Sequence, residues 1–355
     1  MAQTNQFLCV KLRGSDPFAR GVQYGQQAEA LIRRAIEGYH RQFQRSVGQS
    51  WDAVVKRSHY YTDFVNEHYP EEFQEMLGIA EGSGVAVDEI MALNCRYEIL
   101  KLKLLKEASG GKVYLLQNWD YRPWVERHAV IVDIDDLQGT HIIGVTEAGQ
   151  LVRNGMNNHG IGLCANNLTS IYDSGDIGAP VTFVRRKALN SRCFQEMVDV
   201  VTSAKRGVSC NFMLASAENM AVDLETTPKK IYQVQPENGI VTHANHMIAG
   251  AAACTNQGTK FRDGVLRRLL QQGNGTLSFP DIREALCNHE RFPGAGDTYP
   301  ESNCIEAVCS HVPHGEYDEC KVWKTIASSI YDLTAGVAYI CKGCPCENEY
   351  QTFPL

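Results

Sequence analysis

The apolar residues of the first hundred positions recur at the spacing of an amphipathic helix. Positions 28, 31, 32, 35 and 36 are apolar, with charged side chains at 33, 34 and 37. Ser15-Asp16-Pro17 supplies a cap and a proline for the start of this helix. Helical patterns also cover 51–68, 70–81 and 87–105, and a short strand is expected over 7–13. We therefore predict a mostly helical N-terminal portion.

After Gly111 the pattern changes to short apolar runs separated by Gly, Asp and Asn, which is typical of strands. Strands are predicted over 112–119, 128–135, 140–146, 150–156, 160–167, 210–215, 221–225, 230–235, 240–243, 325–332 and 335–341. Helices are predicted over 180–204, 259–272 and 279–289. Because helices and strands come in blocks, the pattern favours an α+β fold over a doubly wound parallel sheet.

The strand over 112–119 leads into a group of polar residues, Gln117-Asn118-Trp119-Asp120. Its apolar run is typical of a strand that is buried on both faces. A carboxylate at the end of such a strand needs a partner, because an unpaired buried charge destabilises a protein strongly. The simpler alternative is that Asp120 only caps the turn that follows.

Two further polar clusters follow predicted strands. One contains Glu147 and continues to Asn157, and the other is Thr242-His243-Ala244-Asn245-His246. Amide groups at such positions suit the stabilisation of an oxyanion, although Asn also commonly satisfies the backbone of a turn. Metal binding at His243 and His246 is not expected, because no carboxylate or third ligand lies nearby in the sequence.

Composition excludes several classes of function. A net charge of −7 without a Lys/Arg cluster argues against nucleic-acid binding. No apolar stretch in the 355-residue chain is long enough to span a membrane. The polar start of the chain lacks the features of a signal peptide. Thirteen cysteines without such a signal favour reduced thiols in the cytoplasm. Cys341, Cys344 and Cys346 lack a second C-x-x-C pair, so neither a metal nor a cofactor is expected.

Eight segments carry a resemblance to a known family. They are Gly14 with Gly21-Val22-Gln23-Tyr24-Gly25, Ile79–Gly82 with Leu93–Glu98, Gln117–Asp120, Thr146–Gly149, Asn157–Gly162, Leu224–Pro228, Thr242–His246 and Ile330–Leu333. In this order they resemble the acyl-coenzyme A:6-aminopenicillanic-acid acyltransferase family, the cysteine branch of the N-terminal-nucleophile hydrolases. The resemblance covers nearly the whole chain.

The resemblance implies an αββα four-layer sandwich that forms one structural domain. Residues 1–107 would be a helical, propeptide-like portion and 108–355 the core. Autocatalytic cleavage before a cysteine would create a thiol nucleophile whose own α-amine acts as its base. Asn245 would donate to the oxyanion and Asp120 would orient the nucleophile. Substrate-binding residues would be Asn118, Trp119, Glu147, Asn157 and His243. The substrate would be a small acylated amine, a peptide-like amide or an acyl thioester.

The chain departs from the family at the nucleophile. The family's cysteine lies roughly sixteen residues before the Asn of its Asn-Trp-Asp strand, and this chain has no cysteine from Arg96 through Leu163. The segment that should carry it is missing between about Lys106 and Ala108. Ser109 is too close to Asn118 to replace it, and Cys95 belongs to the helical region.

Two hypotheses from different classes follow from this departure. The chain is either a spliced or mis-assembled product of a gene for an amide hydrolase or acyltransferase, or a non-catalytic binding or regulatory homologue that keeps the fold. No Arg occurs over 322–325, where some family members have one near the acyl site, so the acyl group stays open. The oligomeric state is also open.

Overall fold

The computed structural model describes residues 5–96, 98, 112–173, 176–256, 258–272, 277–290, 307–312 and 316–355. Its first strand and helices are β1 (Leu8–Arg13), α1 (Pro17–Val47), α2 (Trp51–His68), α3 (Pro70–Ser83) and α4 (Val87–Asn94). Asp16 caps α1 by accepting a hydrogen bond from the backbone N–H of Phe18 at 3.0 Å, as the sequence predicts. The predicted extension of the last helix to residue 105 lies mostly outside the described residues.

Helices α1 and α3 pack with their backbones in direct contact because glycines face each other. A Cβ on Gly21 would lie 2.1 Å from the carbonyl oxygen of Glu75, and a Cβ on Gly78 would lie 2.8 Å from the Cα of Gly21. Gly25 and Gly82 meet in the same way one turn further along. This close approach explains the glycine spacing at the start of the chain.

The larger sheet has eight strands, in the order β1-β3-β4-β5-β6-β7-β8-β9. Their bounds after β1 are β3 (Ala129–Asp135), β4 (His141–Glu147), β5 (Asn154–Asn157), β6 (Ile161–Asn167), β7 (Cys210–Ser216), β8 (Met220–Thr226) and β9 (Ile231–Val234). Strand β1 pairs in parallel with β3, and the other neighbours are antiparallel. The N-terminal portion therefore supplies an edge strand to this sheet, while its predicted boundary at 107 lies outside the described residues.

The smaller sheet is antiparallel, in the order β12-β11-β10-β2. Its strands are β2 (Tyr114–Tyr121), β10 (Lys324–Asp332), β11 (Val337–Lys342) and β12 (Tyr350–Pro354). Tyr114 and Leu116 pack with side chains of α8 (Lys260–Gln271) and α9 (Phe279–Leu286), whereas Leu115 and Trp119 belong to the core on the other face. The alternation along β2 thus separates the two faces of the sheet.

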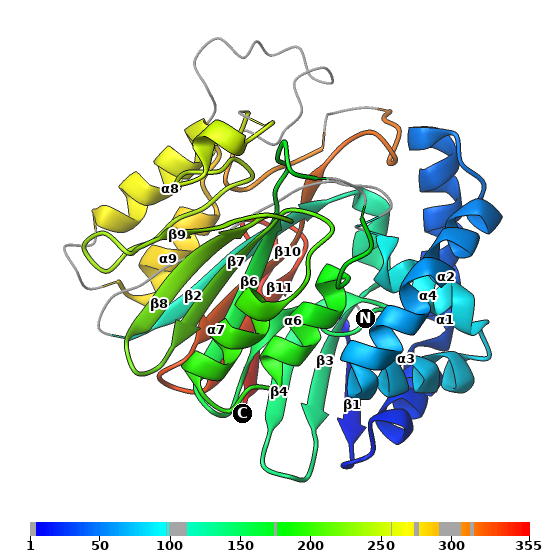
Figure 1. Cartoon of the computed structure of the whole chain (residues 1–355). Helices are drawn as coiled ribbons and strands as arrows, with labels where there is room; N and C mark the ends of the chain where they lie inside the picture. The colour runs from blue at the N-terminus through cyan, green and yellow to red at the C-terminus, as the bar shows by residue number, and fades with distance from the viewer. Residues whose placement is uncertain are drawn as a thin grey trace.

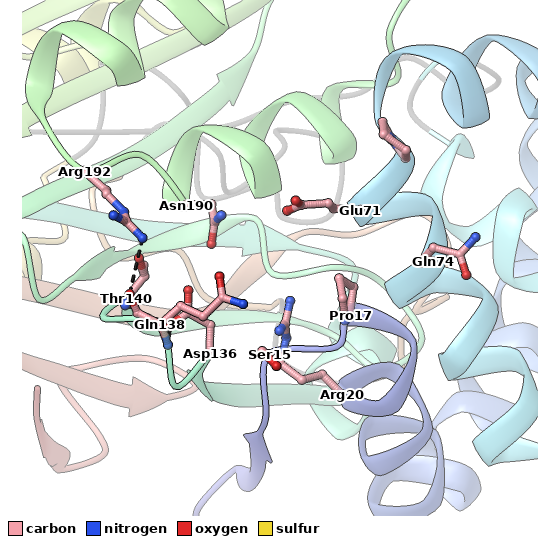
Figure 2. A pocket seen from close by; sticks show the side chains of 11 residues that line it. Ser15, Pro17, Arg20, Glu71, Gln74, Asp136, Gln138, Thr140, Asn190 and Arg192 are labelled. Atoms are coloured by element: carbon pink, nitrogen blue, oxygen red, sulfur yellow. Dashed lines mark hydrogen bonds between the residues drawn. The ribbon is translucent and has the colours of Figure 1, made fainter.

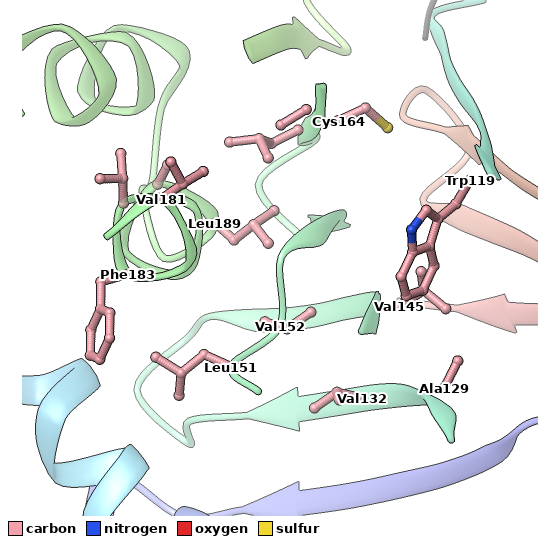
Figure 3. Close-up of a cluster of buried hydrophobic side chains, with 14 of the residues drawn as sticks. Trp119, Ala129, Val132, Val145, Leu151, Val152, Cys164, Val181, Phe183 and Leu189 are labelled. Carbon is pink, nitrogen blue, oxygen red and sulfur yellow. The ribbon is translucent and has the colours of Figure 1, made fainter. Parts of the chain in front are cut away.

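Helices cover the outer faces of both sheets, which gives the order helix, sheet, sheet, helix (Figure 1). Helices α6 (Val181–Leu189) and α7 (Phe194–Ser203) lie on the larger sheet, and α8 and α9 lie on the smaller one. Figure 3 shows the core around the larger sheet, with Phe183 and Leu189 of α6 on one side and Trp119 on the other. The predicted α+β fold with four αββα layers and a mostly helical N-terminal portion is confirmed. Among the described residues, no helix has both the length and the apolar character needed to cross a membrane.

The helix predicted over 180–204 is wrong as one element, because it breaks into α6 and α7 at residues 190–193. The side chain of Asn157 donates hydrogen bonds to the carbonyl oxygens of Leu189, at 3.0 Å, and Ser191, at 2.8 Å. These carbonyl groups are therefore satisfied where the helix ends. A side chain from a distant strand thus stabilises the end of α6, and the local apolar pattern does not reveal this contact.

The strand predicted over 240–243 is also wrong. The chain there is irregular, and one isolated bridge joins Glu237 to Ile240. Side-chain contacts replace a strand ladder, since His243 contacts Glu225 of β8 at 2.9 Å. Strand β12, near the C-terminus, was not predicted from the sequence.

Candidate functional site

Asp120 lies near the end of β2, fully buried, and it faces α8. Its Oδ1 accepts a hydrogen bond of 2.6 Å from Thr325 Oγ1 on the neighbouring strand β10. Its Oδ2 lies 3.3 Å from Arg262 Nη1 and 3.5 Å from Ser310 Oγ. The strand-end carboxylate is thus paired, as the burial of β2 requires.

Arg262 brings Asp120 and Asn245 into one cluster. Its Nη2 donates to Asn245 Oδ1 at 2.9 Å, while its Nη1 faces Asp120. The amide nitrogen Nδ2 of Asn245 donates to the carbonyl oxygen of Asn167, at the end of β6, at 3.1 Å. The two residues predicted to be catalytic therefore share a guanidinium group between the smaller sheet, α8 and the loop before it.

The surroundings of Asp120 make the charged form of its carboxyl group unfavourable. Burial raises the pKa of Asp120 to about 6, although Arg262 and the hydroxyl of Thr325 act in the opposite direction. A carboxyl group with this pKa exchanges a proton near neutral pH. Such a group can orient or hold a neighbouring amine, or serve as a general acid or base.

Arg262, Thr325 and Ser310 were not predicted from the sequence as site residues. Arg262 occupies the buried face of α8, three and four residues before the buried Val265 and Leu266. An arginine on the apolar face of an amphipathic helix is a pattern that could have revealed it, because a buried guanidinium needs an acidic partner. Thr325 and Ser310 become neighbours of Asp120 through tertiary contacts, which no local pattern indicates.

Glu147 forms a second buried cluster at the end of β4. It pairs with Arg96 and, at 3.0 Å, with Arg153, and it accepts a hydrogen bond from the hydroxyl of Tyr39. The guanidinium of Arg153 in turn lies 4.2 Å from the ring centre of Trp119. Two of the predicted substrate-binding residues, Trp119 and Glu147, are therefore linked through Arg153.

His243 belongs to a third group of charges. Burial opposes its protonation, but Asp223 and Glu225 raise the pKa of His243. Burial likewise opposes the charge of Glu225, and the hydrogen bond with His243 lowers the pKa of Glu225. The backbone N–H groups of Ile248 and Gly250 also donate to Glu225. This group of charges therefore holds the loop that carries Asn245.

Asn118 and Asn157, the other predicted substrate-binding residues, make hydrogen bonds within the protein. Asn118 donates to the carbonyl oxygens of Leu286 at 2.8 Å and Val308 at 2.9 Å. Ser328 donates to Asn118 Oδ1 at 2.6 Å. Asn157 caps the end of α6 and lies apart from the Asp120 cluster.

A surface hollow of about 440 Å³ lies elsewhere, at the turn between β3 and β4 (Figure 2). Charged and polar side chains line it, including Arg20, Glu71, Asp136 and Arg192. Glu147 lies at the opposite end of β4 from this turn, and the lining contains no member of the Asp120 cluster. The hollow is therefore separate from the predicted site.

The thiol of Cys95, the cysteine closest before β2 in the sequence, is fully buried. It lies 3.5 Å from the sulfur of Met91, and burial raises the pKa of the Cys95 thiol. A buried thiol of this kind is a poor nucleophile, because the thiolate is the reactive form.

Comparison with known proteins decides the family. The sequence model of the acyl-coenzyme A:6-aminopenicillanic acid acyl-transferase family matches residues 107–347. The chain belongs to this family. The 40 kDa form of acyl-coenzyme A:6-aminopenicillanic-acid-acyltransferase from Emericella nidulans is 25% identical over 304 residues, covering 81% of this chain and 82% of that protein.

Two solved structures are also similar to this member of the acyltransferase family. One is the Caenorhabditis elegans orthologue of N-acylethanolamine-hydrolyzing acid amidase, with 16% identity, a TM-score of 0.42, and coverage of 65% of this chain and 92% of that one. The other is a variant of conjugated bile acid hydrolase from Clostridium perfringens, with 12% identity, a TM-score of 0.43, and coverage of 72% and 97%.

Proposed function

We propose that this chain is the framework of a cysteine N-terminal-nucleophile amide hydrolase or acyltransferase, without the segment that carries the nucleophile. As written, the chain does not cleave itself and does not transfer acyl groups. Its substrate class, once the segment is restored, is a small acylated amine, a peptide-like amide or an acyl thioester. Family membership supports the reaction class, and the position of β2 supports the missing segment.

The observation that carries this proposal is the position of β2 at the end of the strand order that the structure describes for the smaller sheet. Among the strands that the structure describes, β2 pairs only with β10 and ends the order of the smaller sheet. All eight of its residues are nevertheless buried. A strand at the edge of a sheet ordinarily needs a covering element, because its outer N–H and C=O groups make no hydrogen bonds to another strand.

A hairpin partner for β2 would bring the family's cysteine to Asp120. A strand that directly precedes β2 in the chain can pair with it as an antiparallel hairpin, and β10 already occupies the other edge. The start of that strand then lies beside the end of β2, where Asp120 is located. A cysteine roughly sixteen residues before Asn118, with a tight turn midway, occupies this position.

The roles of the neighbouring residues follow from this placement. Asp120, with a pKa of about 6, would be charged above that pH and could hold the α-ammonium group of the new N-terminus. Asn245 would donate its amide to the oxyanion after its Nδ2 turns from the carbonyl oxygen of Asn167. No disulfide joins two of the described cysteines, and we include a cytoplasmic location in the proposal.

A second candidate is a non-catalytic binding or regulatory homologue. The observation that favours it is that Asp120 and Asn245 already have partners within the chain, in Thr325, Arg262 and Asn167. A site in this state is stable without a nucleophile.

Restoring the missing segment separates the two candidates. About nine residues that begin with Gly-Cys-Thr, roughly the length of a strand and a turn, are inserted between Glu107 and Ala108. We expect cleavage before the inserted cysteine, seen by mass spectrometry as a shorter N-terminal and a longer C-terminal fragment, together with hydrolysis of acylated amines. The matched control carries Gly-Ala-Thr and stays intact. Self-cleavage of the unmodified chain would show that the nucleophile is not missing. A Gly-Cys-Thr chain that folds but stays whole and inactive would contradict the enzyme proposal and favour the non-catalytic homologue.

A further inference from the structure

Four side chains from three separate segments meet beside the smaller sheet. They are His289, which follows α9, Cys309 and His311, which flank Ser310, and Cys346, which follows β11. One nitrogen or sulfur atom of each lies within 4.8 Å of those of the other three. Cys309 is buried, His311 is half-buried, and His289 and Cys346 are exposed. No metal was expected from the sequence, because Cys341, Cys344 and Cys346 lack a second C-x-x-C pair. The other three residues of this group come from earlier segments of the chain.

The distances match the edges of a tetrahedron around one zinc ion. With Zn–S of about 2.3 Å and Zn–N of about 2.0–2.1 Å, the edges are about 3.8 Å for S–S, about 3.6 Å for S–N and about 3.4 Å for N–N. Cys309 Sγ lies 3.7 Å from Cys346 Sγ and 3.6 Å from His311 Nε2. His311 Nε2 lies 3.2 Å from Cys346 Sγ and 3.1 Å from His289 Nε2.

A carboxylate supports the ring of His311 from the other side. Glu347 Oε1 lies 3.3 Å from His311 Nδ1, the nitrogen that faces away from the cluster. Histidines that bind metals commonly donate their second ring N–H to such a group, which fixes the tautomer that binds the metal. Cys344 lies beside the same group. Its thiol donates to the carbonyl oxygens of Ser310 at 3.4 Å and Thr325 at 3.5 Å, and its sulfur also lies within 4.8 Å of His311 and Glu347.

We propose that His289, Cys309, His311 and Cys346 bind one zinc ion through two imidazole nitrogens and two thiolates. Binding releases one proton from each of the two thiols, and both histidines bind in the neutral form. Four protein ligands fill the tetrahedron, so the site is structural and holds no exchangeable water for catalysis.

The metal would hold in place the segment that contacts Asp120 through Ser310. The segment between the ligands Cys309 and His311 carries Ser310, whose Oγ lies 3.5 Å from Asp120 Oδ2. The carbonyl oxygen of Ser310 accepts a hydrogen bond from the backbone N–H of Thr325 at 2.8 Å. The backbone N–H of Ser310 donates to Thr325 Oγ1 at 2.9 Å. Zinc would tie this segment to the end of α9 and to the segment after β11.

Metal content measured on the full chain tests the proposal. Protein purified with zinc and dialysed against a weak chelator is expected to hold about one zinc ion per chain by mass spectrometry of the metal. With cobalt alone as the probe, it should show the visible bands of tetrahedral Co²⁺ and a thiolate-to-cobalt charge-transfer band. Cys346→Ser and His289→Gln, both at exposed positions, should lose the tightly bound metal and still fold.

Two further variants sharpen the test. Glu347→Gln should keep the cobalt spectrum and weaken zinc binding by about 10–100-fold, because it removes only the support of His311. Cys193→Ser, at an exposed thiol before α7, is the matched control and should keep about one zinc ion per chain. Folded wild-type protein without metal, unchanged binding in Cys346→Ser, or a disulfide between Cys309 and Cys346 in protein purified under reducing conditions would each overturn the proposal.

Discussion

Two buried carboxylates, Asp120 on β2 and Glu147 on β4, hold different sets of partners. Glu147 faces the guanidinium groups of Arg96 and Arg153 and the hydroxyl of Tyr39. Asp120 faces the guanidinium of Arg262 and two hydroxyl groups, and it shares that arginine with the amide oxygen of Asn245. The first cluster has an excess of positive charge around the carboxylate, whereas the second does not.

The difference separates a structural role from a chemical one. Tyr39 lies on α1 and Arg96 follows α4, so the Glu147 cluster joins the N-terminal helices to the larger sheet. Burial raises the pKa of Tyr39, which keeps its hydroxyl protonated as a donor. The Asp120 cluster instead leaves a carboxyl group with a pKa of about 6 on β2, the last strand in the described order of the smaller sheet. Such a group can change its protonation state near neutral pH.

The largest effect is expected from Glu147→Ala. The change leaves Arg96 and Arg153 buried without their carboxylate, and breaking a buried ion pair in this way costs about 3–5 kcal/mol. Urea unfolding followed by circular dichroism measures this loss. The matched control is Glu29→Ala, which breaks the exposed Glu29–Arg33 pair on α1 and should cost about 0.3–0.5 kcal/mol. Equal losses in the two variants would remove the structural role of the Glu147 cluster.

The second prediction concerns the pH dependence of stability through Asp120. Its pKa of about 6 in the folded state lies above the ordinary 3.8, so the folded protein binds the proton more tightly than the unfolded chain. This contribution is fully present below about pH 4 and is lost as pH rises through about 6. The total is about 3 kcal/mol.

Unfolding free energies of wild type and Asp120→Asn, measured from pH 4 to pH 7, isolate this contribution. The difference, wild type minus variant, should fall by about 2 kcal/mol as pH rises over this range. Asp281→Asn is a control of opposite sign, because the hydrogen bonds of Ser278 lower the pKa of Asp281. Its contribution is lost only as pH falls below the ordinary 3.8, so the difference for Asp281→Asn should stay nearly constant from pH 4 to pH 7. A flat difference for Asp120→Asn would show that Asp120 titrates normally in the folded state.

Much of the fold follows from local patterns in the sequence. The cap at Asp16, the break at Tyr69-Pro70 and the burial of β2 on both faces depend on neighbouring residues, and each is found where the pattern predicts it. The break between α6 and α7 and the irregular loop that carries His243 are different. Each depends on a side chain from a distant strand, Asn157 or Glu225, so a window of sequence could not reveal it.

The candidate site divides in the same way. Asp120 and Asn245 could be selected because a buried strand ends on the first and because the resemblance implies the second. Arg262, which joins them, lies 142 positions from Asp120 in the sequence and contacts it through tertiary packing. The His and Cys ligands of the proposed zinc site come from three segments, so their spacing along the chain does not resemble a known metal motif.

The smallest effect concerns Trp119, which connects the two clusters. It is the neighbour of Asp120 on β2 but points to the other face, where its ring lies 4.2 Å from the guanidinium of Arg153 in the Glu147 cluster. A buried cation–π contact of this kind contributes about 1–2 kcal/mol. A double-mutant cycle with Trp119→Leu and Arg153→Met should give a coupling of this size from unfolding free energies. The cycle subtracts what each variant costs alone, including the loss of the pair between Arg153 and Glu147.

The matched cycle on Arg122 and Trp323, also at 4.2 Å, should give a similar value. A coupling energy near zero for Trp119 and Arg153, with a clear one for the matched pair, would mean that the Asp120 and Glu147 clusters are energetically independent.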